Sequence, residues 1–242
     1  MQNPTAAMLA IGDEILSGRT QDANMHHLAQ ELTAAGIDLR ECRVVADDHD
    51  AIVEAVRALS SRWDHVFTSG GIGPTHDDIT ADAIAAAFDR PIDVRADARA
   101  LLAAHYAASG RELNAARLRM ARIPDGAALI ENPISTAPGF ILENVHVMAG
   151  VPAIFRAMLA SVLPGLTGGA PIQSRTLRVE RPEGDVAEVL GAVAAECPDL
   201  SIGSYPFVEA GVLGTNLVLR GPDPDRLEAA LAELKRRFGG LA

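Results

Sequence analysis

VFTSGGIGPTHDDIT, residues Val66–Thr80, is the most informative stretch of the chain. It predicts a buried strand at His65–Thr68, then a glycine-rich loop, then a helix that begins at two adjacent carboxylates. Because glycine has no Cβ, Gly70, Gly71 and Gly73 would let the backbone approach a ligand closely. The backbone N–H groups of such a loop, and of a helix that follows it, attract anions. The stretch therefore predicts a phosphate-binding site on an α/β sheet.

The two carboxylates at the end of this stretch, Asp77 and Asp78, would repel a phosphate on their own. The conflict disappears if a divalent cation lies between the carboxylates and the phosphate, as magnesium commonly does. The stretch therefore also predicts a metal site.

Strands and helices alternate along the first half of the chain. Short apolar runs predict strands at Ala7–Ile11 and Leu39–Val45, and helical periodicity follows each of them. This alternation predicts a mostly parallel sheet covered by helices on both faces. Ligands bind such sheets beyond the carboxyl ends of the strands. We therefore expect Asp13, Asp47 and Asp78 to come together, since each follows the end of a strand.

Four loops hold the candidate ligand-binding residues. They are Gly12, Asp13 and Glu14; Asp47; Ser69, Gly70, Gly71, Gly73, Pro74, Thr75 and His76; and Asn132, Ser135, Thr136, Pro138 and Gly139. His76 and the hydroxyl groups of the last loop could donate to a phosphate or a ribose. Each loop also has a purely structural interpretation. Asp22 and either Asp48 or Asp50 suit helix N-caps, and the prolines and glycines suit tight turns.

The rest of the chain completes two predicted domains, at residues 1–166 and 174–242. Further strands are expected at Leu129–Glu131 and Phe140–Val147, and the Pro-rich and Gly-rich segment Pro164–Gln173 reads as a linker. Helices are expected at Ala96–Ala108, Glu112–Ala121 and Val151–Leu163. Beyond the linker the pattern is strand, helix, strand, strand, helix. In this order, the five expected elements are Arg175–Val179, Asp185–Glu196, Leu200–Tyr205, Gly211–Arg220 and Asp223–Phe238. This βαββα order predicts a small α+β domain.

Composition excludes several classes of function. The formal net charge of −11 argues against nucleic acid as a partner. No apolar run is long enough for a membrane span or has the form of a signal peptide, so we expect a cytoplasmic protein. Cys42 and Cys197 lie far apart and form no zinc motif. Lys235 is the only lysine, which rules out a P-loop.

Three motifs carry a family resemblance. SGGIGPTHDDIT, GDEILSGRTQDAN and NPISTAPG resemble the molybdopterin-binding (MoaB/Mog-like) domain family, most closely the N-terminal part of competence/damage-inducible protein A (CinA). The resemblance covers Ala7 to about Leu166, and SIGSYPF at Ser201–Phe207 is similar to the KH-like middle domain of CinA proteins. It implies a three-layer α/β/α domain that forms homo-oligomers, either dimers or trimers.

The resemblance also implies candidate activities. CinA-like members are associated with cleavage of ADP-ribose to AMP and ribose 5-phosphate, using a divalent metal and potassium, and Mog-like members adenylylate molybdopterin. By motif position, Asp47 and Asp78 match the acidic pair tied to catalysis. Asp77 stands where the Mog branch commonly has arginine, which favours the CinA-like interpretation. Ser135 replaces a usual glycine and Ala149 a usual proline, so the ligand pose can differ from that of the family.

Three hypotheses follow. The first is metal-dependent hydrolysis of a nucleotide diphosphate sugar, with ADP-ribose as the best candidate. Asp47 and Asp78 would be catalytic, and Asp47, Asp77 and Asp78 would hold magnesium, cobalt or manganese. The second is a molybdopterin-binding protein of molybdenum cofactor biosynthesis. The third is a nucleotide-binding or pterin-binding module without catalysis.

Overall fold

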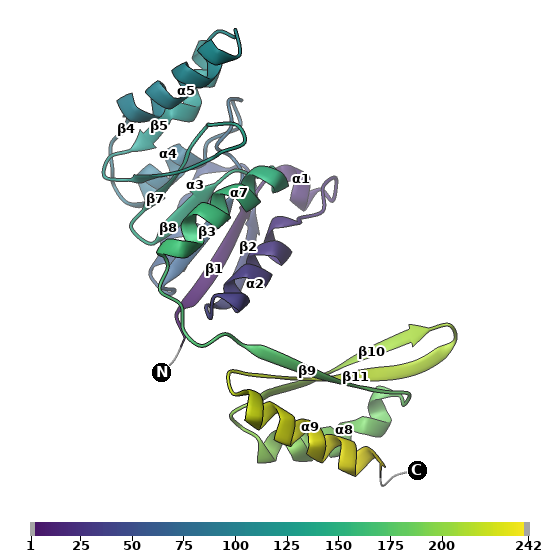
Figure 1. The fold of residues 1–242 in the computed structure, drawn as a ribbon. Helices are drawn as coiled ribbons and strands as arrows, with labels where there is room; N and C mark the ends of the chain where they lie inside the picture. Colours follow the sequence, from purple (N-terminus) through teal and green to yellow (C-terminus); the bar gives the residue numbers. More distant parts are fainter. Residues whose placement is uncertain (1–2, 240–242) are drawn as a thin grey trace. The chain divides into compact units, whose positions relative to one another are not determined.

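The computed structural model describes residues 3–239, which divide into two compact units, Met1–Gly169 and Ala170–Ala242 (Figure 1). The division falls inside the segment Pro164–Gln173. Each unit has its own apolar core. No helix among the described residues combines the length and the apolar character that crossing a membrane requires.

Unit 1 is built on one six-stranded sheet with the order β2-β1-β3-β8-β7-β6. The strands are β1 (Thr5–Ile11), β2 (Asp38–Val45), β3 (His65–Ser69), β6 (Ala128–Ile130), β7 (Gly139–Leu142) and β8 (Val145–Met148). The first four neighbours in the sheet are parallel, while β7 is antiparallel to both β8 and β6. The sheet is therefore mainly parallel, as the alternating pattern predicts.

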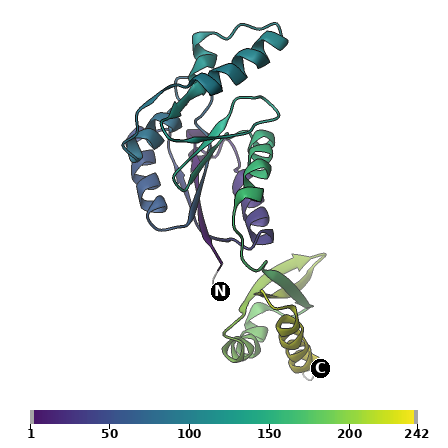
Figure 2. The ribbon, with the colours of Figure 1, turned by 60° about the vertical axis from the view of Figure 1, so that its left-hand side comes forward.

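Helices cover both faces of this sheet (Figure 2). One face packs against α2 (Asn24–Ala34) and α7 (Pro152–Val162), and the other against α3 (His49–Ser60) and α4 (Thr80–Ala87). Strand β1 shows why a helix layer forms on each face of the sheet. All its residues from Ala6 to Ile11 are buried, and Ala7, Leu9 and Ile11 pack in one core while Ala6 and Met8 pack in the other. The predicted three-layer α/β/α fold is confirmed.

Short elements complete unit 1. They are α1 (Asp13–Leu16), β4 (Ile92–Val94), α5 (Ala96–Ala108), α6 (Ala115–Leu118), the 3-10 turns η1 (Arg119–Ala121) and η2 (Leu163–Gly165), and β5 (Arg122–Pro124). The sequence pattern did not predict α1 or the antiparallel β4–β5 pair, because four-residue and three-residue elements are too short to establish a period.

Two predicted elements differ in the structure. Phe140–Val147 is not one strand but a hairpin, in which Glu143 adopts a φ of 52° and Asn144 donates to the carbonyl oxygens of Ser60 (3.0 Å) and Trp63 (2.8 Å). In place of the helix predicted at Glu112–Ala121, the structure has the shorter α6 followed by η1. Asn114 caps it by accepting from the Arg117 N–H group at 3.0 Å, so the three residues from Glu112 lie outside the helix.

Unit 2 has the predicted order β9 (Gln173–Val179), α8 (Glu183–Glu196), β10 (Ser201–Glu209), β11 (Val212–Gly221) and α9 (Pro224–Gly239). Its antiparallel sheet has the order β10-β11-β9, with both helices packed against Leu217 and Leu219. The predicted strand ended at Tyr205, before Pro206. Strand β10 continues to Glu209 because it lies at the edge of the sheet, where proline's missing N–H group is tolerated.

The half-buried His65 of β3 lies beside the buried His146 of β8. The ring of His146 stacks on Phe67 with 4.7 Å between centroids, and its Nε2 lies 3.4 Å from Nδ1 of His65. Nδ1 of His146 is buried without a hydrogen-bond partner among the described residues. Burial, followed by the nearby charge of His65, lowers the pKa of His146 from 6.5 to about 4.

This depressed pKa makes unit 1 sensitive to acid. The unfolded chain takes up a proton at His146 near pH 6.5 and the folded chain only near pH 4, so the stability present above pH 6.5 is lost as the pH falls between these values. The full displacement corresponds to about 3 kcal/mol. We expect the free energy of unfolding of His146→Leu to fall less between pH 7 and pH 4.5 than that of the natural chain. Urea denaturation followed by the fluorescence of Trp63, the only tryptophan, measures it. The exposed His49→Gln variant should keep the natural pH dependence, and an equal dependence in His146→Leu would contradict the assignment.

Candidate functional site

A cleft of about 490 Å³ lies beside the carboxyl ends of the parallel strands in unit 1. The strand ends are tied together there. The Gly12 N–H group donates to the Val45 carbonyl at 3.1 Å, and the Gly70 N–H group donates to the Met148 carbonyl at 3.2 Å. Eleven residues predicted from the sequence line this one cleft: Gly12, Glu14, Asp47, Gly70, Gly71, Gly73, Pro74, Asp77, Asp78, Asn132 and Ser135.

The glycine loop owes its shape to two close approaches. Gly70 has a φ of 110°, and a Cβ there would collide with the carbonyl oxygen of Ile11. Gly71 has a φ of 68°, and a Cβ there would collide with the hydroxyl of Thr80. Thr80 holds the loop from the other side, since its hydroxyl donates to the Gly70 carbonyl and its N–H group to the Gly71 carbonyl, both at 3.0 Å. The backbone is therefore fixed at the wall of the cleft.

Asp78 lies within the loop and not at a helix start, because α4 begins at Thr80. Oδ2 of Asp78 accepts from the Thr75 N–H group at 2.7 Å and from the Thr75 hydroxyl at 2.6 Å. No described residue donates to Oδ1. Thr75 therefore orients one carboxylate oxygen and leaves the other for a ligand.

Asp47 follows β2 and is half-buried in the cleft. Its Oδ2 accepts from the Asp13 N–H group at 3.0 Å, and the neighbouring Asp48 serves as the N-cap of α3. Burial raises the pKa of Asp47 above its ordinary value, and the negative charges of Asp13, Glu14 and Asp77 raise it further. Four carboxylates, those of Glu14, Asp47, Asp77 and Asp78, therefore line the cleft, and none of the described residues that line it carries a positive charge.

The carboxylates do not form a complete metal site by themselves. Within residues 3–239, no three His, Cys, Asp or Glu side chains are grouped so that they could hold a metal ion. Asp47, Asp77 and Asp78 line the same cleft, but a cation there would need further oxygen ligands. Magnesium is commonly bound by one or two carboxylates together with substrate phosphates, and this donor set fits that arrangement.

Comparison with known proteins identifies the family. Residues 7–168 match the family model described as "Probable molybdopterin binding domain". The chain belongs to this family. Residues 171–241 match a second family model, described as the middle domain of FAD synthase.

Individual relatives agree with this assignment. A protein of Pyrobaculum calidifontis is 34% identical over 96% of this chain and 94% of its own length. A CinA-like protein of Desulfosudis oleivorans is 38% identical over 82% of this chain, and a "Probable FAD synthase" of Caenorhabditis elegans is 31% identical over 99% of it. This chain spans 51% of the length of each of the last two.

A solved structure supports the fold of unit 1. The crystal structure of the protein CinA with unknown function from Thermoplasma acidophilum matches with a TM-score of 0.62 and 34% identity. The match covers 68% of this chain and 99% of that chain. The resemblance to CinA-like proteins of the molybdopterin-binding domain family is therefore confirmed.

Seven predicted site residues do not line the cleft. They are Asp13, Ser69, Thr75, His76, Thr136, Pro138 and Gly139. Asp13 and Thr75 act through their bonds to Asp47 and Asp78. The side chain of His76 is 99% exposed, so in this structure it does not reach into the cleft.

The other four residues have structural partners or lie elsewhere in unit 1. The buried Ser69 hydroxyl accepts from Asn24 Nδ2 at 2.7 Å, and the Thr136 hydroxyl lies 3.0 Å from His105 Nδ1. Pro138 lines a smaller neighbouring cavity. Gly139 is buried in β7, where a Cβ would collide with the Val147 carbonyl oxygen.

Asn132 organises the NPISTAPG loop. Its Oδ1 accepts from the N–H groups of Ile134 and Ser135, both at 3.1 Å, and its Nδ2 donates to the Ser135 hydroxyl at 2.6 Å. The Ser135 hydroxyl is thus engaged within the loop and is positioned at the cleft wall. This arrangement explains how serine is accommodated at that position.

An apolar wall that the sequence did not predict completes the cleft. It consists of Ile72, Met120, Val151, Pro152 and Ile154. Val151 is 56% exposed at this wall. The sequence alone does not distinguish apolar residues that line a cleft from apolar residues of the core, so this wall is identified only from the fold. The cleft therefore offers carboxylates and backbone amides together with a surface suited to a flat ring.

The electrostatic strain at Asp47 can be measured. We expect Asp47→Asn to raise the melting temperature at pH 7, because it removes a half-buried charge that the neighbouring carboxylates disfavour. The raised pKa means that the gain should shrink as the pH falls and the natural Asp47 becomes protonated. Asp50→Asn is the matched control, since it removes the same charge from a 98% exposed side chain in the first turn of α3. A lower melting temperature for Asp47→Asn than for Asp50→Asn would contradict this account.

Proposed function

We propose that this chain is a metal-dependent hydrolase of a nucleotide diphosphate sugar, with ADP-ribose as the best candidate substrate. The observation that carries the proposal is that Asp47, Asp77 and Asp78 share one cleft with the glycine loop. Exposed backbone amides of such a loop bind phosphate, and the carboxylates require a cation to tolerate it.

The chain's own residues would divide the work. The amides of the glycine loop would hold the diphosphate, and the apolar wall around Met120 and Ile154 would hold the adenine ring. Asp78, oriented by Thr75, would hold the cation through Oδ1. A bound divalent cation would offset the phosphate charge and lower the pKa of a water molecule.

Asp47 suits the role of proton acceptor. Its pKa lies above the ordinary value, so its carboxylate is a better base than an exposed aspartate. The Asp13 N–H group fixes Oδ2, so the side chain is held in the cleft while Oδ1 has no donor among the described residues. Asp47 would therefore accept at Oδ1 the proton of the water that attacks one phosphorus, while the bridging P–O bond breaks and leaves AMP and ribose 5-phosphate.

Asp78→Asn tests the proposal. Asparagine keeps an oxygen that can accept from Thr75, so the loop should stay folded while the negative charge is lost. We expect AMP release from ADP-ribose to fall by at least about a hundredfold. The measurement is chromatographic detection of AMP with magnesium, cobalt or manganese, over a panel of nucleotide diphosphates that includes ADP-ribose and FAD. Asp50→Asn should retain the natural rate, and an active Asp78→Asn enzyme would rule out the assigned role.

A second candidate function is molybdopterin binding in molybdenum cofactor biosynthesis. The family model of unit 1 carries that description, and the apolar wall could receive a pterin ring as well as an adenine. The glycine loop would then hold the terminal phosphate of molybdopterin. This function shares the cleft with the first but uses no attacking water.

The two candidates give different products. Under the second, ATP and molybdopterin with magnesium should yield an adenylylated pterin, and ADP-ribose should remain intact. Under the first, ADP-ribose should disappear and AMP should accumulate. Mass spectrometry of both reactions with one preparation of the protein separates them.

A further inference from the structure

The proposed function assigns a cation to the carboxylates of the cleft but no cationic side chain to the phosphate. The described residues that line it include Glu14, Asp47, Asp77 and Asp78 but no Lys, Arg or His. A diphosphate in this cleft would meet donors only from the backbone and from neutral side chains. Any cationic side chain that contacts the phosphate would therefore come from beyond this lining.

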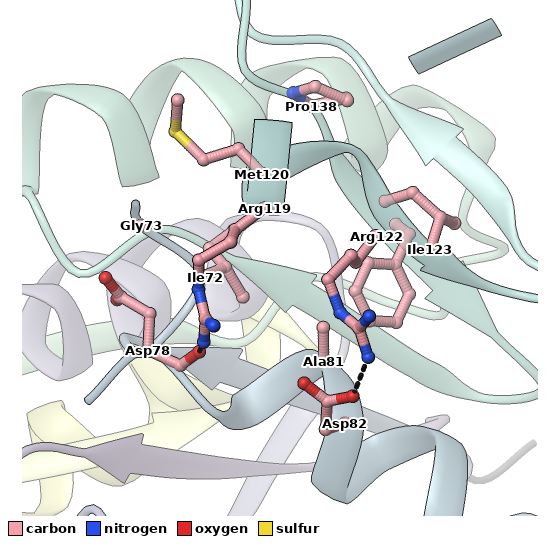
Figure 3. A pocket seen from close by; sticks show the side chains of 12 residues that line it. Ile72, Gly73, Asp78, Ala81, Asp82, Arg119, Met120, Arg122, Ile123 and Pro138 are labelled. Atoms are coloured by element: carbon pink, nitrogen blue, oxygen red, sulfur yellow. Dashed lines mark hydrogen bonds and ion pairs between the residues drawn. The ribbon is translucent and has the colours of Figure 1, made fainter. Parts of the chain in front are cut away.

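Arg119 lies in that position. It lines a small cavity next to the cleft (Figure 3), and Gly71, Ile72, Gly73 and Asp78 border both this cavity and the cleft. Met120, the next residue, also borders both. The Arg119 side chain extends beside Ile72 toward Asp78 in Figure 3. Arg119 therefore shares four loop residues with the predicted phosphate site.

The guanidinium of Arg119 makes few of the hydrogen bonds that it could donate. Its Nη2 donates to the Asp78 carbonyl over a long 3.3 Å, and its Nε is buried without any hydrogen-bond partner among the described residues. No described carboxylate lies within ion-pair distance of it. Arg122 in the same cavity differs, because it forms an ion pair with Asp82, drawn as a dashed line in Figure 3.

This difference separates a structural arginine from one available to a ligand. A partly buried guanidinium without a counter-charge is unfavourable, and a phosphate supplies both the charge and paired acceptors that fit its fork. Leaving its present position would cost little, since the only bond broken is the long one to Asp78. The five N–H donors of arginine also match phosphate oxygens better than a lysine would.

We propose that Arg119 binds a phosphoryl group of the ligand at the glycine loop, turning from the Asp78 carbonyl to the phosphate. The inference rests on the proposed function for the identity of the site and adds the missing cation to it. It narrows the ligand class to molecules with at least one phosphate next to the loop. Arg119 then offsets the negative charge of the phosphate that remains after the cation held by Asp78 has bound.

The test measures binding of inorganic pyrophosphate with magnesium by calorimetry. We expect Arg119→Gln to weaken binding by at least about tenfold, and Arg119→Lys to weaken it less. Arg122→Gln is the matched control from the same cavity and should stay within about twofold of the natural chain. Adenosine, which has no phosphate, serves as a second probe, and its affinity should be the same for Arg119→Gln and the natural chain.

The outcomes separate the inference from the proposed function. Natural affinity for pyrophosphate in Arg119→Gln, or an equal loss for adenosine, would overturn the role of Arg119. Weakened pyrophosphate binding by Arg119→Gln would support it even if the natural chain leaves ADP-ribose intact, in which case only the proposed function fails. If Arg119→Gln does not fold, Arg119→Met takes its place, because it removes the buried Nε and keeps an apolar stem.

Discussion

Contact between the glycine loop and the end of β1 is the constraint on which the site depends. Gly70 lies so close to the Ile11 carbonyl that no side chain fits between them, and Thr80 fixes Gly71 from the start of α4. This contact brings the loop after β3 against the end of β1, and β1 pairs with β2, which carries Asp47 beyond its end. The sheet register thus determines which carboxylates meet the loop.

The charged groups in and beside the cleft are incompletely paired within the described residues. Burial and neighbouring carboxylates raise the pKa of Asp47, while the guanidinium of Arg119 lies nearby without a counter-charge. Arg119 lines the small cavity, Asp47 and Asp77 line the cleft, and Asp78 borders both. A phosphate with a cation could engage both sets, since the phosphate suits Arg119 and the cation suits the aspartates.

Sequence patterns predicted the layers well and the details of the loops less well. Short apolar runs such as Ala7–Ile11 predict buried strands when they alternate with helices, so the fold class followed from them. The βαββα order of unit 2 followed in the same way. The hairpin at Glu143 depends on a φ of 52° and on bonds from Asn144 to distant carbonyls, which no local pattern encodes. Arg119 was not predicted because its significance lies in a missing partner, and a partner's absence becomes visible only in three dimensions.

The two halves of the cleft restrict the shape of its ligand more than its reaction. The glycine loop suits a phosphate, the carboxylates suit a cation bound to that phosphate, and the apolar wall with its exposed Val151 suits a flat ring. A molecule that has both a phosphate and a ring would span the cleft. ADP-ribose and molybdopterin both have these parts. What separates hydrolysis from adenylylation is whether water reaches the phosphorus beside Asp47. Under the proposed hydrolysis, the half-buried position of Asp47 and its raised pKa would favour activation of a water molecule over its exclusion.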